Sequence, residues 1–321
     1  MFAVYAESFS AEDPMSGLVI GERPDPELIP GWSRVKVQAA SINHHDLWTL
    51  RGIGITQDRL PMILGCDAAG IDDAGNPVLV YSVVADPSYE DESLDPDRSL
   101  LSEVHQGTFA DYVMVPSRNL LSLPSSMTMA EAACLPTAWL TAYRMLAVRS
   151  GLRPGDTVLV QGAGGGVATA AITLARVMGM RVWVTSRDEE KRTAAVDLGA
   201  HQVFEAGDRL PERVDAVVET VGAATWDHSL KALKPGGRVV VTGATSGPNP
   251  PADLARVFFK QLSIVGSTMG TRRELEQLIA LCDVTGVRPL IADELPMADA
   301  KVALDRIATG NVFGKLVLTR D

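Results

Sequence analysis

The pattern of hydrophobic positions changes character along the chain. Residues 34–42 alternate apolar and polar side chains with a period of two, which predicts a half-buried β-strand. Short apolar runs at 77–84 and 109–116 predict further strands. Between them, the acidic and proline-containing segment 85–99 is typical of a surface loop. Residues 1–122 are therefore expected to be rich in β-structure.

Further along, predicted strands alternate with predicted helices. The strands are expected at 157–161, 181–185, 201–204, 215–220, 238–243 and 262–267, and the helices at 166–179, at 188–199 and just before 233–237. Such alternation predicts a parallel sheet with helices on both faces. Six strands complete a doubly wound dinucleotide-binding domain. We expect this domain to span 123–266.

The last part of the chain carries two amphipathic helices and one strand. Apolar positions recur at helical spacing over 275–282 and over 300–307. The apolar strand 314–319 needs partners, and we expect it to pair with the β-rich N-terminal part. A second domain would then combine 1–122 with 267–321.

Composition and charge exclude several classes of protein. The chain has 321 residues, of which 46% are hydrophobic and 21% charged, as in soluble two-domain proteins. A net charge of −11 argues against general binding to nucleic acid or to anionic membranes. The sequence shows neither a membrane span nor a signal peptide, so we expect a cytoplasmic protein. Its three cysteines are too few and too scattered for a disulfide framework.

The strongest local motif is a glycine cluster between a predicted strand and a predicted helix, where residues 158–175 read VLVQGAGGGVATAAITLA. Glycines let the backbone approach a pyrophosphate, which the free N–H groups of the helix N-terminus can bind. The dinucleotide fingerprint falls on Ala163, Gly165 and Ala168, so two expected glycines are alanines. A tight turn without a ligand is the alternative, and the strand–helix–strand context favours the dinucleotide. The predicted phosphate-binding residues are Ala163, Gly164, Gly165, Gly166 and Val167.

The end of the second strand in this domain bears on the choice of cofactor. An NAD site usually carries Asp or Glu there, to bind the ribose 2′-hydroxyl. This chain instead has Ser186 and Arg187, followed one helical turn later by Lys191 and Arg192. Cations attract a 2′-phosphate, so we predict NADPH in preference to NADH. The alternative is that these cations form an exposed helix face paired with the acidic residues 188–190.

Seven segments, in this order, resemble one protein family. They read ASINHHDLWTLRG (40–52), LPMILGCDAAG (60–70), GTFADYVMVP (107–116), LPTAWLTAYRML (135–146), LRPGDTVLVQGAGGGVATAAI (152–172), LKPGGRVVVTG (233–243) and NVFGKLVL (311–318). The chain thereby resembles the medium-chain dehydrogenase/reductase superfamily, and more narrowly its zinc-independent, quinone-oxidoreductase-like branch. The resemblance implies an α/β fold, in which a GroES-like β-rich catalytic domain packs on a Rossmann domain with the active site between them. It also implies a homodimer formed through the last Rossmann strand, 262–266.

The resemblance raises the question of zinc. Zinc-dependent members bind a catalytic zinc through a Cys, a His and a further Cys or Glu, which leaves one position open for the substrate. The matching positions here hold Asn43, Cys66 followed by Asp67, and Thr137. The region of the structural zinc lobe is the cysteine-free acidic loop. We therefore expect no zinc, although a site built with one of the two adjacent histidines stays open.

The segment that follows the strand 34–42 carries candidates for chemistry without a metal. Asn43 can hold a carbonyl or the nicotinamide ribose by hydrogen bonding. His45 stands where zinc-dependent relatives often carry a hydroxyl of the proton relay, and it can donate a proton near neutral pH, with a structural role as the alternative. Asp46 is expected to hold a neighbouring loop. Trp48, where quinone reductases often have Tyr, would give an apolar stacking wall.

By the same resemblance, the nicotinamide end of the cofactor is expected to contact Thr137, Thr242, Gly243, Ser267, Phe313, Gly314 and Lys315. The leading hypothesis is an enzyme that uses NADPH to transfer hydride to a quinone or an α,β-unsaturated carbonyl without zinc. A zinc-type alcohol or aldehyde dehydrogenase is one alternative, which the unmatched ligand positions oppose. A non-catalytic NADPH-binding sensor is the other, which the lack of an assured proton donor favours.

Overall fold

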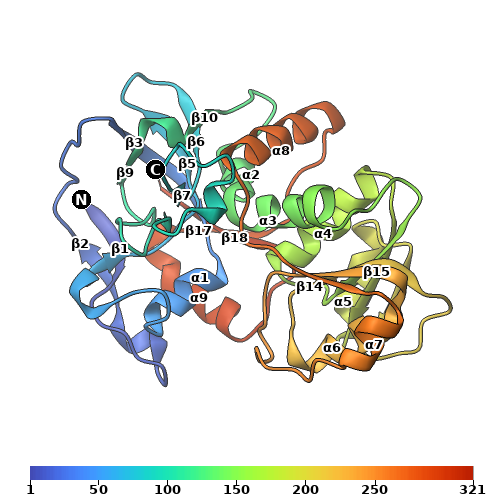
Figure 1. The fold of residues 1–321 in the computed structure, drawn as a ribbon. Helices are drawn as coiled ribbons and strands as arrows, with labels where there is room; N and C mark the ends of the chain where they lie inside the picture. The colour runs from blue at the N-terminus through green and yellow to red at the C-terminus, as the bar shows by residue number, and fades with distance from the viewer. Residues whose placement is uncertain (321) are drawn as a thin grey trace. The chain divides into compact units, whose positions relative to one another are not determined.

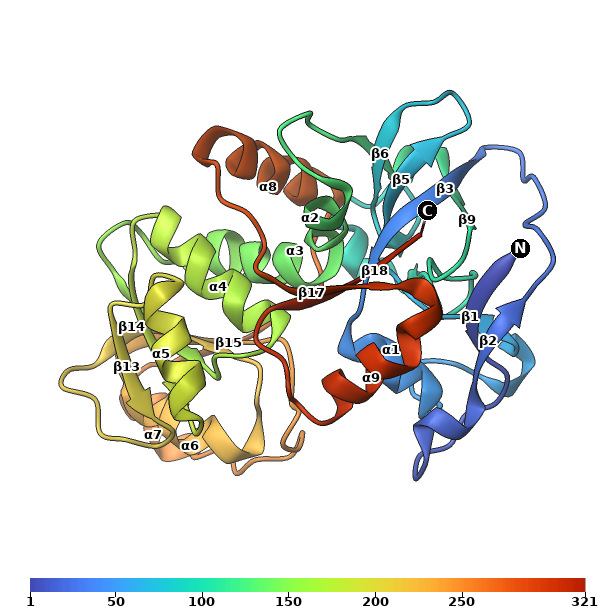
Figure 2. The same cartoon turned by 180° about the vertical axis from the view of Figure 1, so that it is seen from behind.

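The structure of the protein is a computed structural model, which describes residues 1–320. Contacts between residues divide the chain into two compact units. The central unit is Trp139–Met269, and the terminal unit combines Met1–Ala138 with the residues from Gly270 onward. Figures 1 and 2 show the elements of each unit from opposite sides. Within the described residues, no helix is both long and apolar enough to cross a membrane.

The central unit is built on a six-stranded parallel sheet. Its strands are β11 (Thr157–Gln161), β12 (Arg181–Ser186), β13 (Gln202–Glu205), β14 (Val214–Glu219), β15 (Leu233–Val241) and β16 (Ser263–Gly266). They lie in the order β13-β12-β11-β14-β15-β16, and every neighbouring pair is parallel. This is the strand order of a doubly wound dinucleotide domain, so the fold class predicted for this part of the chain is confirmed.

The central unit contains the three predicted helices, which are α4 (Gly166–Val177), α5 (Glu189–Asp197) and α6 (Ala223–Ala232), and two that were not predicted, α3 (Leu140–Tyr143) and α7 (Leu254–Phe259). Every residue of β11 is buried, which explains why its sequence is a continuous apolar run rather than an alternating one. Leu159, Trp183 and Val217 belong to the core beneath the helices. The glycine loop therefore lies between a fully buried strand and a packed helix.

The terminal unit is mostly antiparallel sheet. Its strands are β1 (Phe2–Ala6), β2 (Leu18–Glu22), β3 (Trp32–Ser41), β4 (Met62–Ile63), β5 (Ala69–Asp72), β6 (Pro77–Val80), β7 (Val83–Val84), β8 (Ser99–Leu100), β9 (Tyr112–Pro116), β10 (Leu120–Ser122), β17 (Ile291–Pro296) and β18 (Lys315–Thr319). The main sheet has the order β10-β6-β5-β3-β18-β17, and β9 also pairs with β3. Strand β18 lies antiparallel to β3, with Val317 opposite Ser41. The expected return of the C-terminal strand to the N-terminal part is confirmed.

Two details of this sheet differ from the sequence predictions. The predicted strand 77–84 is divided into β6, which pairs with β5 and β10, and β7, which pairs with β8 in a separate sheet. At the break between them, the Asn119 side chain donates a hydrogen bond to the Tyr81 carbonyl. Strand β17 was not predicted. All of its residues are at least partly exposed, so it lacks the apolar alternation by which a strand is recognised.

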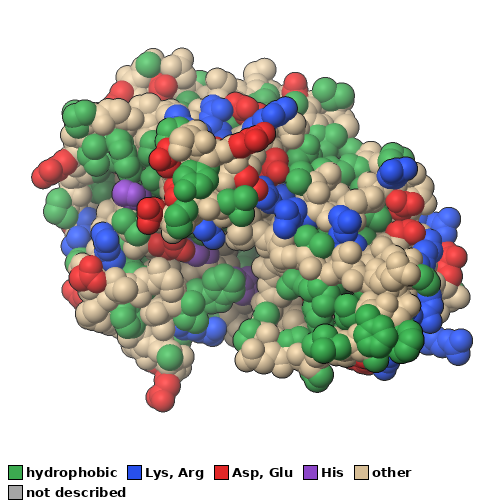
Figure 3. Space-filling view, viewed as in Figure 1, with side chains coloured by type: hydrophobic (Ala, Val, Ile, Leu, Met, Phe, Trp, Pro, Cys, Tyr) green, Lys and Arg blue, Asp and Glu red, His purple; other side chains and the backbone are tan. Residues whose placement is uncertain are grey.

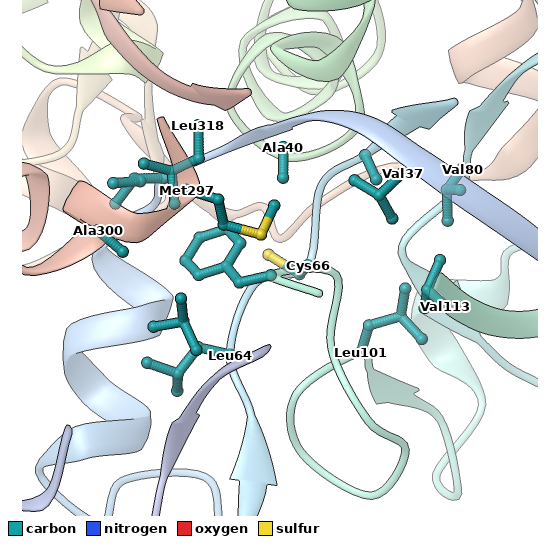
Figure 4. Packing of buried hydrophobic residues seen from close by; sticks show 14 of the residues in the cluster. Val37, Ala40, Leu64, Cys66, Val80, Leu101, Val113, Met297, Ala300 and Leu318 are labelled. Atoms are coloured by element: carbon teal, nitrogen blue, oxygen red, sulfur yellow. The ribbon is translucent and has the colours of Figure 1, made fainter. Parts of the chain in front are cut away.

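The helices of the terminal unit pack on the core of its sheets. They are α1 (His44–Leu50), α2 (Met129–Ala133), α8 (Arg272–Thr285) and α9 (Ala300–Ala308). Figure 4 shows part of this core, in which Leu64, Cys66 and Leu101 lie among side chains from β3, β18 and α9. The segment 123–138 was assigned to the Rossmann domain from the sequence. It contains α2, which packs on β3 and β5, so in the structure the unit boundary falls after Ala138.

Candidate active site

Asp67 is the centre of a buried polar cluster in the terminal unit. It lies in the connection between β4 and β5 and is fully buried. Its Oδ1 accepts hydrogen bonds from Thr137 Oγ1 at 2.5 Å and Ser82 Oγ at 3.2 Å. Its Oδ2 accepts from Asn43 Nδ2 at 2.8 Å and Ser41 Oγ at 2.9 Å. A buried carboxylate needs such donors to offset its desolvation. We call these five residues the Asp67 cluster.

Asn43 joins the Asp67 cluster to Lys315 at the start of β18. One amide hydrogen of Asn43 is directed at Asp67, and the carbonyl of Ser41 lies 3.3 Å from the same nitrogen. The Asn43 side-chain oxygen accepts from Lys315 Nζ at 2.7 Å, and Lys315 Nζ also donates to the Ile42 carbonyl at 2.6 Å. If the Asn43 amide were flipped, its oxygen would face the Asp67 carboxylate and its NH₂ would face the Lys315 ammonium, and neither contact is a hydrogen bond. These two neighbours therefore fix the orientation of the amide. Lys315, a predicted cofactor residue, is 3% exposed.

Asp46 fixes the N-terminus of α1. Its Oδ2 accepts from the Asn43 backbone N–H at 2.8 Å, and its Oδ1 from the Gly65 N–H at 3.0 Å. The expected structural role, holding a neighbouring loop, is therefore confirmed. Gly65 has a φ of +90°, and a Cβ there would lie 2.3 Å from the ring of Phe109. Burial raises the pKa of Asp46 from 3.8 to about 6, against the opposing effect of His45.

His45 and Trp48 lie on α1 but have different surroundings. The His45 Nε2 is 3.0 Å from Glu103 Oε1, and the histidine side chain is nearly buried. Trp48 is 38% exposed, so it presents part of its ring to solvent in the terminal unit. Glu103 had no role in the sequence predictions. It lies 58 residues from His45 in the chain, and no local pattern links the two.

The remaining predicted residues of the terminal unit lie at the turn into β18. Gly314 has a φ of +109°, and a Cβ there would lie 2.6 Å from the Leu290 carbonyl oxygen. Phe313 precedes it and is partly buried. The glycine is therefore required by the turn itself, whatever ligand the neighbouring residues contact.

The glycine loop of the central unit is arranged differently. Gly162, with a φ of +83°, turns the chain after β11, and Gly165 is the N-cap of α4. No side chain caps this helix. A Cβ on Gly165 would meet no atom within 4 Å, and its φ of −75° suits any residue. Neither packing nor backbone conformation explains the glycine. The open space and the free N–H groups at this helix N-terminus are compatible with the pyrophosphate that the sequence predicts there.

At the end of β12, the predicted cations have different roles. The Arg192 guanidinium donates to the Ser186 carbonyl at 2.7 Å, and Ser186 Oγ accepts from the Asp188 N–H at 3.2 Å. Asp188 accepts from the Lys191 N–H and so caps α5. Arg187 is exposed, and its side chain has no hydrogen-bond or ion-pair partner within residues 1–320. Of the cations predicted at this strand end, Arg187 is therefore the one whose side chain is left open to solvent without a protein partner among the described residues.

Three predicted residues lie at the carboxyl ends of β15 and β16. The Thr242 N–H donates to the Glu219 carbonyl at 3.1 Å, and the Ser267 N–H to the Val241 carbonyl at 2.9 Å. Gly243 follows Thr242. The Ser267 Oγ is buried, and no group in the described part of the chain bonds to it. Ligands of doubly wound domains bind at this edge of the sheet, so a buried hydroxyl without a partner there is consistent with a cofactor.

The chain matches families and proteins that are already known. Residues 29–125 match the family described as alcohol dehydrogenase GroES-like domain, and residues 166–283 the family described as zinc-binding dehydrogenase. A zinc-type alcohol dehydrogenase-like protein, YogA, from Leptosphaeria maculans is 30% identical over 90% of this chain and 91% of its own length. The human quinone oxidoreductase is 28% identical over 88% of each chain.

Two further proteins extend this similarity. The acryloyl-coenzyme A reductase of Metallosphaera sedula is 29% identical over 94% of this chain and 96% of its own. A solved structure of an NAD-dependent alcohol dehydrogenase is 32% identical, covers 100% of both chains and has a TM-score of 0.92. The chain therefore belongs to the medium-chain dehydrogenase/reductase superfamily of oxidoreductases, with a GroES-like domain and a Rossmann domain.

The residues of the terminal unit do not fit the zinc ion that these names imply. The Asn43 amide turns its NH₂ toward Asp67, and its oxygen lies against the Lys315 ammonium. Burial, followed by the charge of Asp67, raises the pKa of the Cys66 thiol well above its usual range. Zinc binds deprotonated thiolates and free lone pairs, which this arrangement does not offer. Among residues 1–320, no three His, Cys, Asp or Glu side chains are grouped to hold a metal.

Proposed function

We propose that this protein is an NADPH-dependent oxidoreductase that transfers hydride to a quinone or an α,β-unsaturated carbonyl without a metal. The observation that carries this proposal is the Asp67 cluster, in which Asn43 and Thr137, matched by the family resemblance to zinc-ligand positions, instead donate hydrogen bonds to Asp67. A metal polarises a simple carbonyl. A conjugated acceptor spreads the developing negative charge over several atoms, so it needs less electrostatic help and depends more on positioning.

Two relatives support this class of acceptor by their names. The name of the human quinone oxidoreductase indicates a quinone as acceptor, and that of the acryloyl-coenzyme A reductase indicates a conjugated thioester. Other relatives are named alcohol dehydrogenases, so similarity alone does not choose between the classes. The choice rests on the Asp67 cluster.

The central unit would hold the cofactor. The pyrophosphate would lie at the N-terminus of α4 against Gly165, and the 2′-phosphate near Arg187. Ser267 Oγ would then gain the partner that it lacks. When bound, the reduced nicotinamide supplies the hydride. These assignments support NADPH in preference to NADH.

Asn43 and Trp48 would contact the acceptor. Of the hydrogen bonds from the Asn43 amide to oxygen, the one to the Ser41 carbonyl is longer, at 3.3 Å, than the one to Asp67, at 2.8 Å. A substrate oxygen could replace the Ser41 carbonyl while Asp67 keeps the amide oriented. The exposed ring of Trp48 would provide an apolar surface for a conjugated acceptor.

A panel of acceptors tests the proposed function. NADPH oxidation is measured with p-benzoquinone, cyclohex-2-enone and a simple aldehyde, and the reverse reaction with simple alcohols. We expect turnover with the first two, and a loss of kcat/KM of about tenfold or more in Asn43→Ala, because one donor to the developing oxyanion is removed. Efficient oxidation of simple alcohols without turnover of quinones or enones contradicts the proposal. Tight NADPH binding without any turnover indicates a sensor.

We also propose a homodimer formed through β16. This strand is at the edge of the central sheet, so one side of its backbone is unpaired. Ile264 on β16 and Leu254, Phe258 and Phe259 on the neighbouring α7 segment are exposed. Figure 3 shows the hydrophobic side chains gathered over α7. Light scattering should give the mass of a dimer, and Ile264→Lys should shift it to that of a monomer.

A further inference from the structure

We propose that Glu103 and His45 form a proton-donating pair, in which Glu103 positions the imidazole and His45 delivers the proton that the reduced acceptor needs. This inference rests on the proposed function and deepens it. Reduction of a conjugated carbonyl requires one hydride and one proton. The Asp67 cluster offers no acid that could supply the proton. Its carboxylate accepts hydrogen bonds from four side chains, and its hydroxyls donate to that carboxylate.

The geometry holds both partners of this pair in place. His45 Nε2 lies 3.0 Å from Glu103 Oε1. The second carboxylate oxygen, Glu103 Oε2, accepts from the Leu100 N–H at 2.8 Å. The two side chains are 10% and 24% exposed, so the pair is shielded from solvent without being sealed from it. A carboxylate that is itself held by the backbone can set the ring orientation of its histidine.

The other ring nitrogen of His45 has no partner. Its Nδ1 is buried, and no group among the described residues bonds to it. Because Nε2 points at a carboxylate, it carries a proton in both charge states of the ring, and Nδ1 is the atom that gains or loses one. A buried nitrogen left unpaired is costly to stability. A substrate oxygen that accepts from Nδ1–H in the bound complex accounts for this cost.

The charges that face His45 favour its protonated form. Burial alone lowers the pKa of His45, but the hydrogen bond to Glu103 and the charges of Asp46 and Asp67 outweigh it and raise the pKa above 6.5. The helix α9 and the turn Pro14–Gly17 pack against α1 with apolar and small residues. The ring therefore stays charged to a higher pH than a free histidine, as a general acid requires.

The proposed step balances as follows. The hydride, which the reduced nicotinamide supplies and which leaves that ring oxidised, forms a C–H bond at the β-carbon of the enone, and the C=C electron pair moves through the α-carbon toward the carbonyl oxygen. The Nδ1–H bond of the imidazolium breaks, and its proton forms an O–H bond at that oxygen. The products are the enol, which becomes the saturated carbonyl by proton exchange with water, and neutral His45, which takes a proton back from water. For a quinone, the reduced form takes protons readily from water, so His45 matters less.

The test compares His45→Gln, Glu103→Gln and the control Glu90→Gln. Glu90 is exposed in the same acidic region, so its substitution changes the net charge equally without touching His45. The first measurement is kcat/KM against pH for NADPH with cyclohex-2-enone and with p-benzoquinone. The second is the ¹⁵N NMR titration of histidine-labelled protein without any substrate, in which His45→Gln identifies the signals of His45 among the five histidines.

We expect Glu103→Gln to move the alkaline limb of the enone profile down by about one pH unit, and the NMR titration of His45 by a similar amount. His45→Gln should lower enone kcat/KM by about a hundredfold and remove that limb. Quinone reduction should fall by a smaller factor than enone reduction in both variants, because the reduced quinone takes protons readily from water. Glu90→Gln should leave all profiles in place. Glu103→Asp, which keeps the charge, should restore part of the shift.

Three results would overturn the pair. An unmoved NMR titration in Glu103→Gln shows that Glu103 does not control the ring. A shifted titration with an unmoved enone profile shows that His45 does not donate the proton. Equal losses with enone and quinone in both variants show a purely structural role. If the unmodified protein reduces no enone at all, the proposed function fails as well, and the NMR result shows separately whether the two residues are coupled.

Discussion

The Asp67 cluster of the terminal unit and the glycine loop of the central unit differ in how many of their polar groups find hydrogen-bond partners within the chain. In the Asp67 cluster, both oxygens of one buried carboxylate accept from four side chains, and Asn43 is held again by Lys315. At the glycine loop, no side chain caps α4, and the space beside Gly165 is open. The difference teaches that the side chains of one region satisfy one another by hydrogen bonds, whereas the other region keeps open space and free N–H groups beside α4.

Because the Asp67 cluster is held by its own hydrogen bonds, we expect its substitution to affect the stability of the protein first. Asp67→Asn replaces an acceptor of four hydrogen bonds with an amide, whose NH₂ faces other donors. We expect the free energy of unfolding to fall by about 3–5 kcal/mol. Urea denaturation measures it, with the exposed Asp299→Asn in the same unit as the control. A change below about 1 kcal/mol would mean that the carboxylate is not the centre of this cluster.

Asp46 should give the stability a specific pH dependence. Its pKa is raised from 3.8 to about 6 in the folded protein, so the unfolded chain releases this proton first. Between these two values the folded state holds more protons, and its stability falls as the pH rises. By pH 7 the cost is about 3 kcal/mol. Stability lost in Asp46→Asn should therefore be greater at pH 4 than at pH 7, as measured by urea denaturation. Equal losses at both pH values contradict this pKa.

The glycine loop should show the opposite behaviour to the Asp67 cluster. In Gly165→Val the new side chain meets no protein atom at its Cβ, so the free energy of unfolding should change by less than about 1 kcal/mol. The side chain occupies the space proposed for the pyrophosphate, so the affinity for both NADPH and NADH should fall by about tenfold or more. Fluorescence titration measures the affinity. If Gly165→Val kept its affinity for both cofactors but lost stability, the glycine would serve the fold and not the cofactor.

Arg187→Ala sharpens the same comparison at the other end of the cofactor. Loss of one charge-assisted hydrogen bond to the 2′-phosphate should weaken NADPH by about 1–3 kcal/mol and leave NADH nearly unchanged. Arg209→Ala is the matched control, because Arg209 is also exposed in the central unit. Titration with both cofactors decides the matter. Equal weakening of NADPH and NADH, or an original preference for NADH, would exclude a 2′-phosphate site at Arg187.

The sequence alone determined most of the central unit. Buried parallel strands appear in the sequence as continuous apolar runs, and helices as apolar positions that recur with a period of about 3.6 residues. Both patterns can be recognised within a short stretch of sequence. All six strands of the central sheet were expected, as was the loop that precedes α4. The pairing of the last strand with β3 also followed, because an apolar strand needs partners. The ordered segments of the family resemblance supported the same fold.

The tertiary structure decided the polar chemistry of the terminal unit. Asp67, Thr137 and Lys315 are far apart in the chain, and only the folded sheet brings the first two together and the third onto Asn43. The role of Glu103 could not be read from its neighbours, because Glu103 lies in a turn and its partner His45 lies on α1, 58 residues away in the chain. Helix and strand patterns record which face a residue buries. A hydrogen bond between distant segments depends on a distance that no local pattern contains.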